Sequence, residues 1–279
     1  MTVGSSQIAV FFDEAAPPDS QEVLADWIER SGDIVERYYG RFPVPHLEIH
    51  VRGAPGGGVK TGTTYGMRGG LIRVVVGREA TAAELKDDWV LVHEMIHLSL
   101  PDAGQEHSWL SEGLATYVEG IARAQSGNRT QEDVWAEQMR SMPKGLPQTG
   151  DQGLDRTHTW GRTYWGGALF CLIADVRIHQ ATQGRFGLQE ALRAIARKSG
   201  GLPADWPIER IFATGDEATG SKTLQKLYAE WKDQPIAPDL KALWSDLGIE
   251  RDGNTLQLRD DAPLASIRRD IMRPRASQP

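Results

Sequence analysis

The segment that most constrains this chain is the apolar stretch over residues 88–98. It contains His93, Glu94 and His97 in the pattern His-Glu-x-x-His. The intervening and flanking residues are almost all apolar: Val90, Leu91, Val92, Met95, Ile96 and Leu98. Apolar residues on all sides predict a buried helix. Two imidazoles and a carboxylate cost free energy in such a helix unless they have partners, and a metal ion would provide one.

The pattern predicts one helix over residues 82–100, with Thr81 as its N-cap and Glu84 closing a capping box. Residues four apart share a helix face, so His93 and His97 can hold one ion together. Neutral imidazoles suit zinc, and a catalytic zinc site keeps one position open for water. Glu94 is placed about 100° around the helix from His93, where it can act as a general base.

Composition restricts both the ligands and the partners. A single cysteine, Cys171, excludes an intrachain disulfide and cysteine-based metal sites, so histidines and carboxylates are the remaining ligands. Cys171 lies in an apolar stretch and is expected to be a core residue. Lys plus Arg is 31 and Asp plus Glu is 38, a net charge of -7 that argues against nucleic-acid binding. No apolar run reaches the roughly 18 residues that span a bilayer, so no membrane insertion is expected.

The N-terminal segment lacks the positive region of a signal peptide, because the first basic residue is Arg30. The chain is therefore expected to be cytoplasmic if complete, and periplasmic or secreted if a signal peptide was removed. The oligomeric state stays open.

The pattern of elements predicts an α+β fold in two lobes. Strands are expected over residues 7–12, 46–52 and 71–76, and a helix over 20–39. Later helices are expected over residues 109–125, 131–142, 160–183, 188–198 and 223–231, with a short strand over 255–258. We expect an N-terminal α/β lobe over residues 1–105 and a mostly helical lobe over 106–279, together forming one catalytic domain.

A zinc site needs a third protein ligand, and the metzincin spacing fails because Leu100 and Ala103 occupy its positions. The candidates that follow the motif are Glu106, His107, Glu112 and Glu119. Trp109-Leu110-Ser111-Glu112-Gly113 resembles the Trp-Leu-x-Glu-Gly segment of gluzincin metallopeptidases, in particular the aminopeptidase N-like and glycyl aminopeptidase-like families. The resemblance implies a thermolysin-like gluzincin catalytic domain with Glu112 as the third zinc ligand. His107 is the alternative ligand.

A second segment, Thr163-Tyr164-Trp165-Gly166-Gly167-Ala168, resembles the Tyr-x-Lys-Gly-Ala segment of these enzymes. The resemblance implies that Tyr164 donates a hydrogen bond to the oxyanion formed during catalysis. A core aromatic role for Tyr164, or His158 as the donor, are the alternatives. The paired glycines suggest close packing, plausibly against the zinc-binding helices.

A third segment, Tyr65-Gly66-Met67-Arg68-Gly69-Gly70, resembles the Gly-x-Met-Glu-Asn segment of the family. The resemblance implies substrate binding by Met67, Arg68, Gly69 and Gly70, and an edge strand over residues 71–76 that pairs with an extended substrate. Arg68 stands where the aminopeptidases have the glutamate that binds a free α-amino group, so aminopeptidase specificity is not carried over. The glycine-rich residues 53–62 do not match a phosphate-binding loop, because Val59 precedes Lys60, and a loop is expected there.

The combined expectation is a metallopeptidase with one zinc ion, in which Glu94 activates water and a peptide or protein is the substrate. Two alternatives stay open. One is a zinc hydrolase on the same fold that does not cut peptides, and the other is an inactive zinc-binding scaffold. The substrate and the choice between exopeptidase and endopeptidase cannot be derived from these residues.

Overall fold

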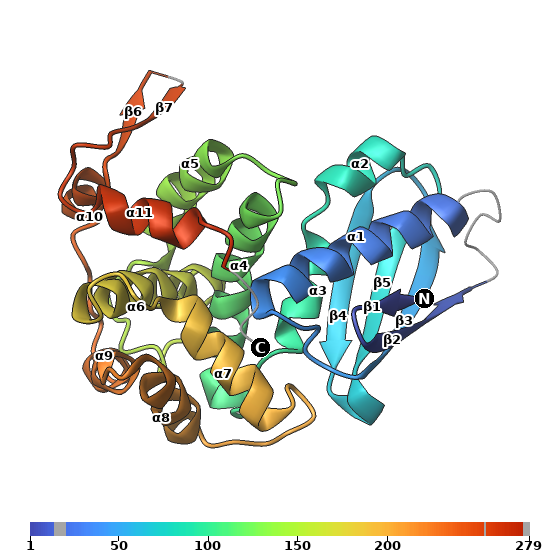
Figure 1. Ribbon diagram of the computed structural model, residues 1–279, viewed down its shortest axis with the longest axis horizontal. Helices are drawn as coiled ribbons and strands as arrows, with labels where there is room; N and C mark the ends of the chain where they lie inside the picture. Colours follow the sequence, from blue (N-terminus) through green and yellow to red (C-terminus); the bar gives the residue numbers. More distant parts are fainter. Residues whose placement is uncertain (14–20, 254, 276–279) are drawn as a thin grey trace. The chain divides into compact units, whose positions relative to one another are not determined.

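The computed structural model describes residues 1–13, 21–253 and 255–275 (Figure 1). The chain divides into two compact units. The first unit contains Met1–Asp102 and Ile195–Asp205, and the second contains Ala103–Ala194 and Trp206–Pro274. The first unit is built around a sheet and the second is mostly helical, so the predicted mixed sheet and helical lobe are confirmed.

The first unit contains a five-stranded sheet in the order β1-β2-β3-β5-β4. The strands are β1 (Thr2–Val3), β2 (Ser6–Phe12), β3 (His46–Ala54), β4 (Val59–Tyr65) and β5 (Leu71–Gly77). The inner strands β2, β3 and β5 are parallel, and β1 and β4 are antiparallel to their neighbours. In β3, Leu47, Ile49 and Val51 are buried, which is the two-residue alternation of a strand with one covered face.

The sheet order corrects the predicted edge strand. Residues 71–76 lie in β5, which pairs with β3 on one side and β4 on the other, so an added strand has no place to bind there. The edge is β4, and it contains Val59–Gly62, which were expected to be a loop. The glycines and threonines of this segment do not alternate with apolar residues, so the sequence pattern does not predict a strand there. β4 is identified only by its pairing with β5 in the structure.

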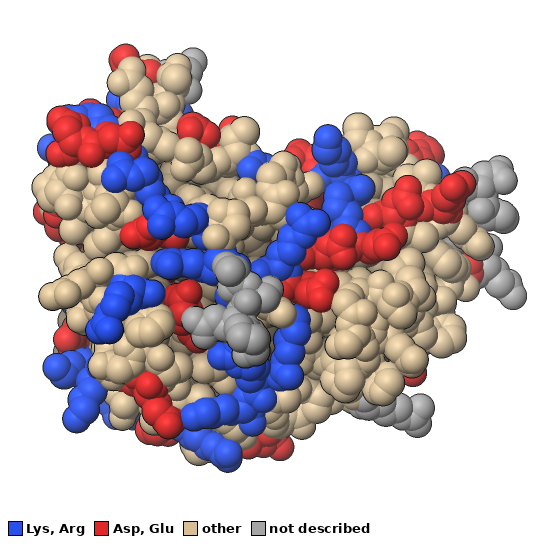
Figure 2. All heavy atoms as spheres, viewed as in Figure 1, with Lys and Arg blue, Asp and Glu red and all other residues tan. Residues whose placement is uncertain are grey.

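Helix α1 (Gln21–Tyr39) lies along the sheet of the first unit (Figure 1). Its buried residues recur every three or four positions and include Leu24, Trp27, Ile28, Val35 and Tyr38. Its acidic residues recur in the same way on the face that is not buried: Glu22, Asp26, Glu29, Asp33 and Glu36. Figure 2 shows a row of acidic side chains where Figure 1 draws α1. α1 is therefore an amphipathic helix, as predicted.

The single helix predicted over residues 82–100 is two helices, α2 (Ala82–Asp87) and α3 (Val90–His97). The capping box is confirmed: the Thr81 side chain accepts a hydrogen bond from the Glu84 N–H, and the Glu84 carboxylate accepts one from the Thr81 N–H. The chain breaks at Asp88, whose backbone is extended with ψ at 137°. The Asp88 carboxylate accepts hydrogen bonds from the first N–H groups of α3, which competes with helix continuation.

The second unit has a helical core. Its helices are α4 (Ser108–Gln125), α5 (Gln131–Ser141), α6 (Gly167–Ala181), most of α7 (Leu188–Ser199), α8 (Ile208–Thr219), α9 (Thr223–Trp231), α10 (Leu240–Leu247) and α11 (Ala265–Met272). Phe170 makes ring contacts with Trp109, Phe212 and Trp231 and forms an aromatic centre. A hairpin of β6 (Ile249–Asp252) and β7 (Thr255–Leu258) completes the unit.

Helices α4 and α6 pack closely at two glycines. A Cβ atom added to Gly167 would lie 2.0 Å from the carbonyl oxygen of Trp109, and one added to Gly113 would lie 2.2 Å from the Cα of Gly167. The expected close packing is therefore confirmed for Gly167, against the helix that carries Glu112.

Cys171, one turn further along α6, is buried. Burial, and then the nearby charge of Asp175, raise the pKa of its thiol. Across the described part of the chain, no helix is long and apolar enough to cross a membrane.

Candidate metal centre

The short helix α3 carries His93, Glu94 and His97. Every residue of α3 is buried, and the three polar side chains are between 5% and 9% exposed. The rings of His93 and His97 are 4.9 Å apart at an interplanar angle of 86°. The four-residue spacing therefore brings both imidazoles to one side of a helix whose remaining residues, apart from Glu94, are apolar.

The Glu112 carboxylate, on α4, belongs to the same group of potential ligands. One ligand atom from each of His93, His97 and Glu112 lies within 4.8 Å of the other two. No other group of this kind is found among the described residues. Two imidazole nitrogens and one carboxylate oxygen form a donor set that zinc accepts in catalytic sites, so these residues fit the ion that the motif predicts.

The alternative ligand His107 is held elsewhere. Its Nδ1 lies 3.1 Å from Asp155 Oδ1, and the same carboxylate accepts hydrogen bonds from the Trp109 indole and the Tyr228 hydroxyl. Burial, and then the bond to Asp155, raise the pKa of Tyr228. Asp155 therefore organises three aromatic side chains of the second unit, and sequence reasoning missed it because it follows no motif.

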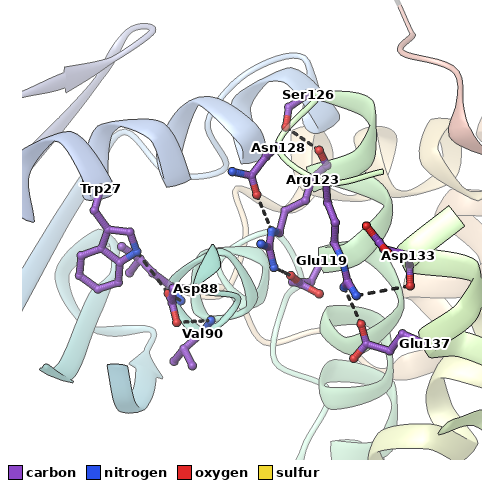
Figure 3. Close-up of polar contacts among 11 residues, drawn as sticks. Trp27, Asp88, Val90, Glu119, Arg123, Ser126, Asn128, Asp133 and Glu137 are labelled. Atoms are coloured by element: carbon purple, nitrogen blue, oxygen red, sulfur yellow. Dashed lines mark hydrogen bonds and ion pairs between the residues drawn. The ribbon is translucent and has the colours of Figure 1, made fainter. Parts of the chain in front are cut away.

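The other two ligand candidates also lie outside the group. The side chain of Glu106 is largely exposed. Glu119 is buried and accepts a hydrogen bond from Arg123 one turn later in α4, at 2.8 Å (Figure 3). Burial raises the pKa of the Glu119 carboxyl, and the charge of Arg123 opposes the shift. The Glu119–Arg123 pair extends to Asn128, which accepts from Arg123 Nε.

Asp88 secures the N-terminal end of α3. Its carboxylate accepts hydrogen bonds from the N–H groups of Val90 and Leu91, both at 3.1 Å, and from the indole of Trp27 on α1, at 3.2 Å (Figure 3). Acceptors at a helix start satisfy N–H groups that have no partner within the helix. An aspartate two residues before an apolar helix is the signal that could have revealed this cap.

Glu94 also has a partner outside its helix. The Thr64 side chain on β4 lies 2.6 Å from one oxygen of the Glu94 carboxylate. Thr64 was not predicted as a site residue, because its proximity to Glu94 depends on the position of β4 in the sheet. The contact joins the edge strand to the helix of the motif.

Tyr164 lies in a π-helical turn, Arg162–Gly166, directly before α6. π-helical turns are rare and occur frequently at functional sites. The Tyr164 ring stacks on Trp160 at a centroid distance of 5.8 Å, and Trp160 is 61% exposed. Tyr164 is half-buried, so it is not a core aromatic residue of the second unit.

The predicted substrate-binding residues form a tight connection between β4 and β5. Met67–Gly69 is a 3-10 turn, and Met67 is 57% exposed. The φ angle of Gly69 is 105°, which favours glycine, and a Cβ atom added to Gly70 would lie 2.8 Å from Leu98 Cδ2. The side chain of Arg68 lies outside what the structure describes.

Neither protein-family models nor curated protein sequences match this chain significantly. Solved structures do match it. An aminopeptidase N family protein from Idiomarina loihiensis aligns over 91% of this chain with a TM-score of 0.63 and 13% identity. The native yeast LTA4 hydrolase aligns over 86% with a TM-score of 0.57 and 14% identity, and the M1 zinc metallopeptidase from Deinococcus radiodurans over 86% with 0.53 and 15%.

The alignments cover 50%, 40% and 51% of those three chains, so this chain spans about half of their length or less. At identities this low, the matches show similarity of fold alone. The similarity agrees with the mixed sheet and the helical unit described above. The chain therefore has the gluzincin, aminopeptidase-like fold of the M1 zinc metallopeptidases.

Proposed function

We propose that this protein is a zinc-dependent metallopeptidase. The observation that carries the proposal is the grouping of His93, His97 and Glu112, whose ligand atoms lie within 4.8 Å of one another. M1 zinc metallopeptidases are among the solved structures with the same fold, which supports the proposal. When bound, zinc would polarise the scissile carbonyl and lower the pKa of a water molecule.

The chain's own residues supply the remaining chemistry. Glu94 accepts a proton from the attacking water and later delivers it to the leaving amine, as a general base and then a general acid. Tyr164 is proposed to donate a hydrogen bond to the carbonyl oxygen as negative charge develops on it, a contribution on the order of 3 kcal/mol to the transition state. Burial of the α3 side chains keeps bulk water away from Glu94 and strengthens its electrostatic interactions.

The substrate is proposed to be an extended peptide that adds to the free edge of β4 through main-chain hydrogen bonds. Met67, Arg68, Gly69 and Gly70 follow β4 directly and are proposed to contact the bound chain. β4 itself contains no aspartate or glutamate that could bind a free α-amino group. We therefore leave the need for a free terminus to the experiment.

The test combines metal analysis with peptide profiling. Purified protein should contain one zinc per chain, and it should cleave members of a mixed peptide library until a chelator is added. Clearly substoichiometric zinc under gentle purification would contradict the proposal. The cleavage products show directly whether a free terminus is required.

Glu94→Gln separates a hydrolase from a binding scaffold. The variant should retain zinc while turnover falls by about 10²–10⁴-fold, because an amide cannot accept the proton. Glu29→Gln, on the exposed face of α1, is the matched control and should leave both unchanged. Full activity in Glu94→Gln would exclude Glu94 as the base.

The match to LTA4 hydrolase favours a second candidate, a non-peptidase hydrolase. For that candidate, Glu94→Gln would lower the turnover of a substrate other than a peptide.

A further inference from the structure

We propose that Thr64 on the edge strand β4 is a positioning residue for the carboxylate of Glu94, and that Gly62 provides the space for it. The inference rests on the proposed function for its catalytic consequence. Its structural part, the placement of one side chain by another strand, can be tested without any activity.

The first observation is the hydrogen bond itself. Thr64 Oγ1 lies 2.6 Å from Glu94 Oε2 and 2.9 Å from the backbone carbonyl oxygen of Glu94. A hydroxyl has one proton, and 2.6 Å is in the range of a charge-assisted bond to a carboxylate. The Thr64 hydroxyl therefore donates to the carboxylate and fixes one of its two oxygens.

The second observation is the space left by Gly62. A Cβ atom added to Gly62 would lie 2.5 Å from Glu94 Cγ and 3.0 Å from its Cδ and Oε1. Real side chains essentially never approach so closely, so any larger residue would displace the Glu94 side chain. Gly62 and Thr64 are two residues apart and share one face of β4. One strand face thus supplies both the space and the hydrogen-bond donor.

The third observation is where this strand lies. β4 is the edge of the sheet, with β5 on one side and its other edge unpaired by any strand of the described sheet. The strand proposed to receive the substrate therefore also determines the orientation of the proposed base. A general base must be held in hydrogen-bond reach of its proton, and small displacements cost large factors in rate.

The experiment compares Thr64→Val, which removes the hydroxyl at nearly constant shape, with Thr64→Ser, which keeps it. The control is Thr63→Val, because Thr63 lies on the opposite face of β4 and its hydroxyl donates to the Gly62 carbonyl oxygen. Crystal structures of the zinc-loaded variants should show the Glu94 carboxylate in its original position in Thr64→Ser and Thr63→Val. In Thr64→Val the carboxylate should move or become disordered while the backbones superpose.

The kinetic expectation is a loss confined to turnover. Thr64→Val should lower kcat by about tenfold or more with KM and zinc content unchanged, and Thr64→Ser should recover most of the loss. An unmoved Glu94 side chain in Thr64→Val would overturn the proposal, whether or not the protein is a peptidase. A parallel loss of zinc content and thermal stability would also overturn it, because a merely structural residue would behave so. If the proposed function is wrong and this proposal is right, the wild-type protein will be inactive, but the Glu94 carboxylate will still move in Thr64→Val.

Discussion

Replacing Asp88 by alanine tests how the motif helix is held in place. Its carboxylate accepts two backbone N–H bonds from the start of α3 and one bond from the Trp27 indole on α1. Trp27 is 1% exposed, so water does not readily replace a lost acceptor for its indole N–H. Asp88→Ala should therefore destabilise the helix that carries His93 and His97.

The expected cost follows from the two groups of bonds. Loss of a helix cap typically costs about 1 kcal/mol. A buried donor left without a partner costs about 1–3 kcal/mol. The sum is about 2–4 kcal/mol, at the lower end if water reaches the partly exposed cap. Asp88→Asn keeps one oxygen, which can still accept from the Leu91 N–H and the Trp27 indole, and it loses the acceptor of the Val90 N–H, so it should cost less than half of this amount.

The measurement is urea unfolding of the metal-free protein, combined with hydrogen exchange at the amides of Val90 and Leu91. The urea midpoint should fall and these two amides should exchange faster in Asp88→Ala. Asp26→Ala is the matched control, because Asp26 lies beside Trp27 on the exposed face of α1. It should change the free energy of unfolding by less than about 0.5 kcal/mol. An unchanged midpoint with unchanged exchange in Asp88→Ala would refute the assignment of Asp88 as the cap of α3.

Two further predictions concern the second unit. Gly167→Ala should lower the free energy of unfolding by about 1–3 kcal/mol in urea titrations, because its Cβ would meet the Trp109 carbonyl oxygen at 2.0 Å; a neutral effect would contradict the close packing of α4 and α6. Burial holds the pKa of Glu119 above its ordinary value of 4.5, so the folded protein binds a proton on this carboxyl more tightly than the unfolded chain does. That proton binding stabilises the folded state at low pH, and the stabilisation is lost as the pH rises from 4.5 through the raised pKa. The stability of Glu119→Gln relative to wild type should therefore increase from pH 4.5 to neutral pH, and a pH-independent difference would exclude the shift.

Features set by neighbouring residues could be predicted from the sequence. His93 and His97 share a helix face because an α-helix repeats every 3.6 residues, wherever that helix lies. The capping box of Thr81 and Glu84 involves residues three apart, and it forms as expected. Strand alternation in β3 and the amphipathic pattern of α1 follow equally local rules.

Features set by the topology could not be predicted in this way. Whether β4 or β5 forms the sheet edge depends on strand order, and the pattern of β5 is the same in either position. Thr64 and Glu94 are 30 residues apart, and His107 and Asp155 are 48 apart. Periodicity carries no information about such pairs, because their proximity depends on how whole elements pack.

The sequence by itself determined the chemistry that the motif helix offers: two imidazoles on one face, a carboxylate beside them and an apolar surrounding. The tertiary structure decided how that chemistry is held. Asp88 separates α3 from α2, Asp155 occupies His107, and Thr64 reaches Glu94 from the edge strand. The physical reason is range, since helix and strand periodicities act over a few residues, whereas these contacts require the folded chain to bring distant segments together.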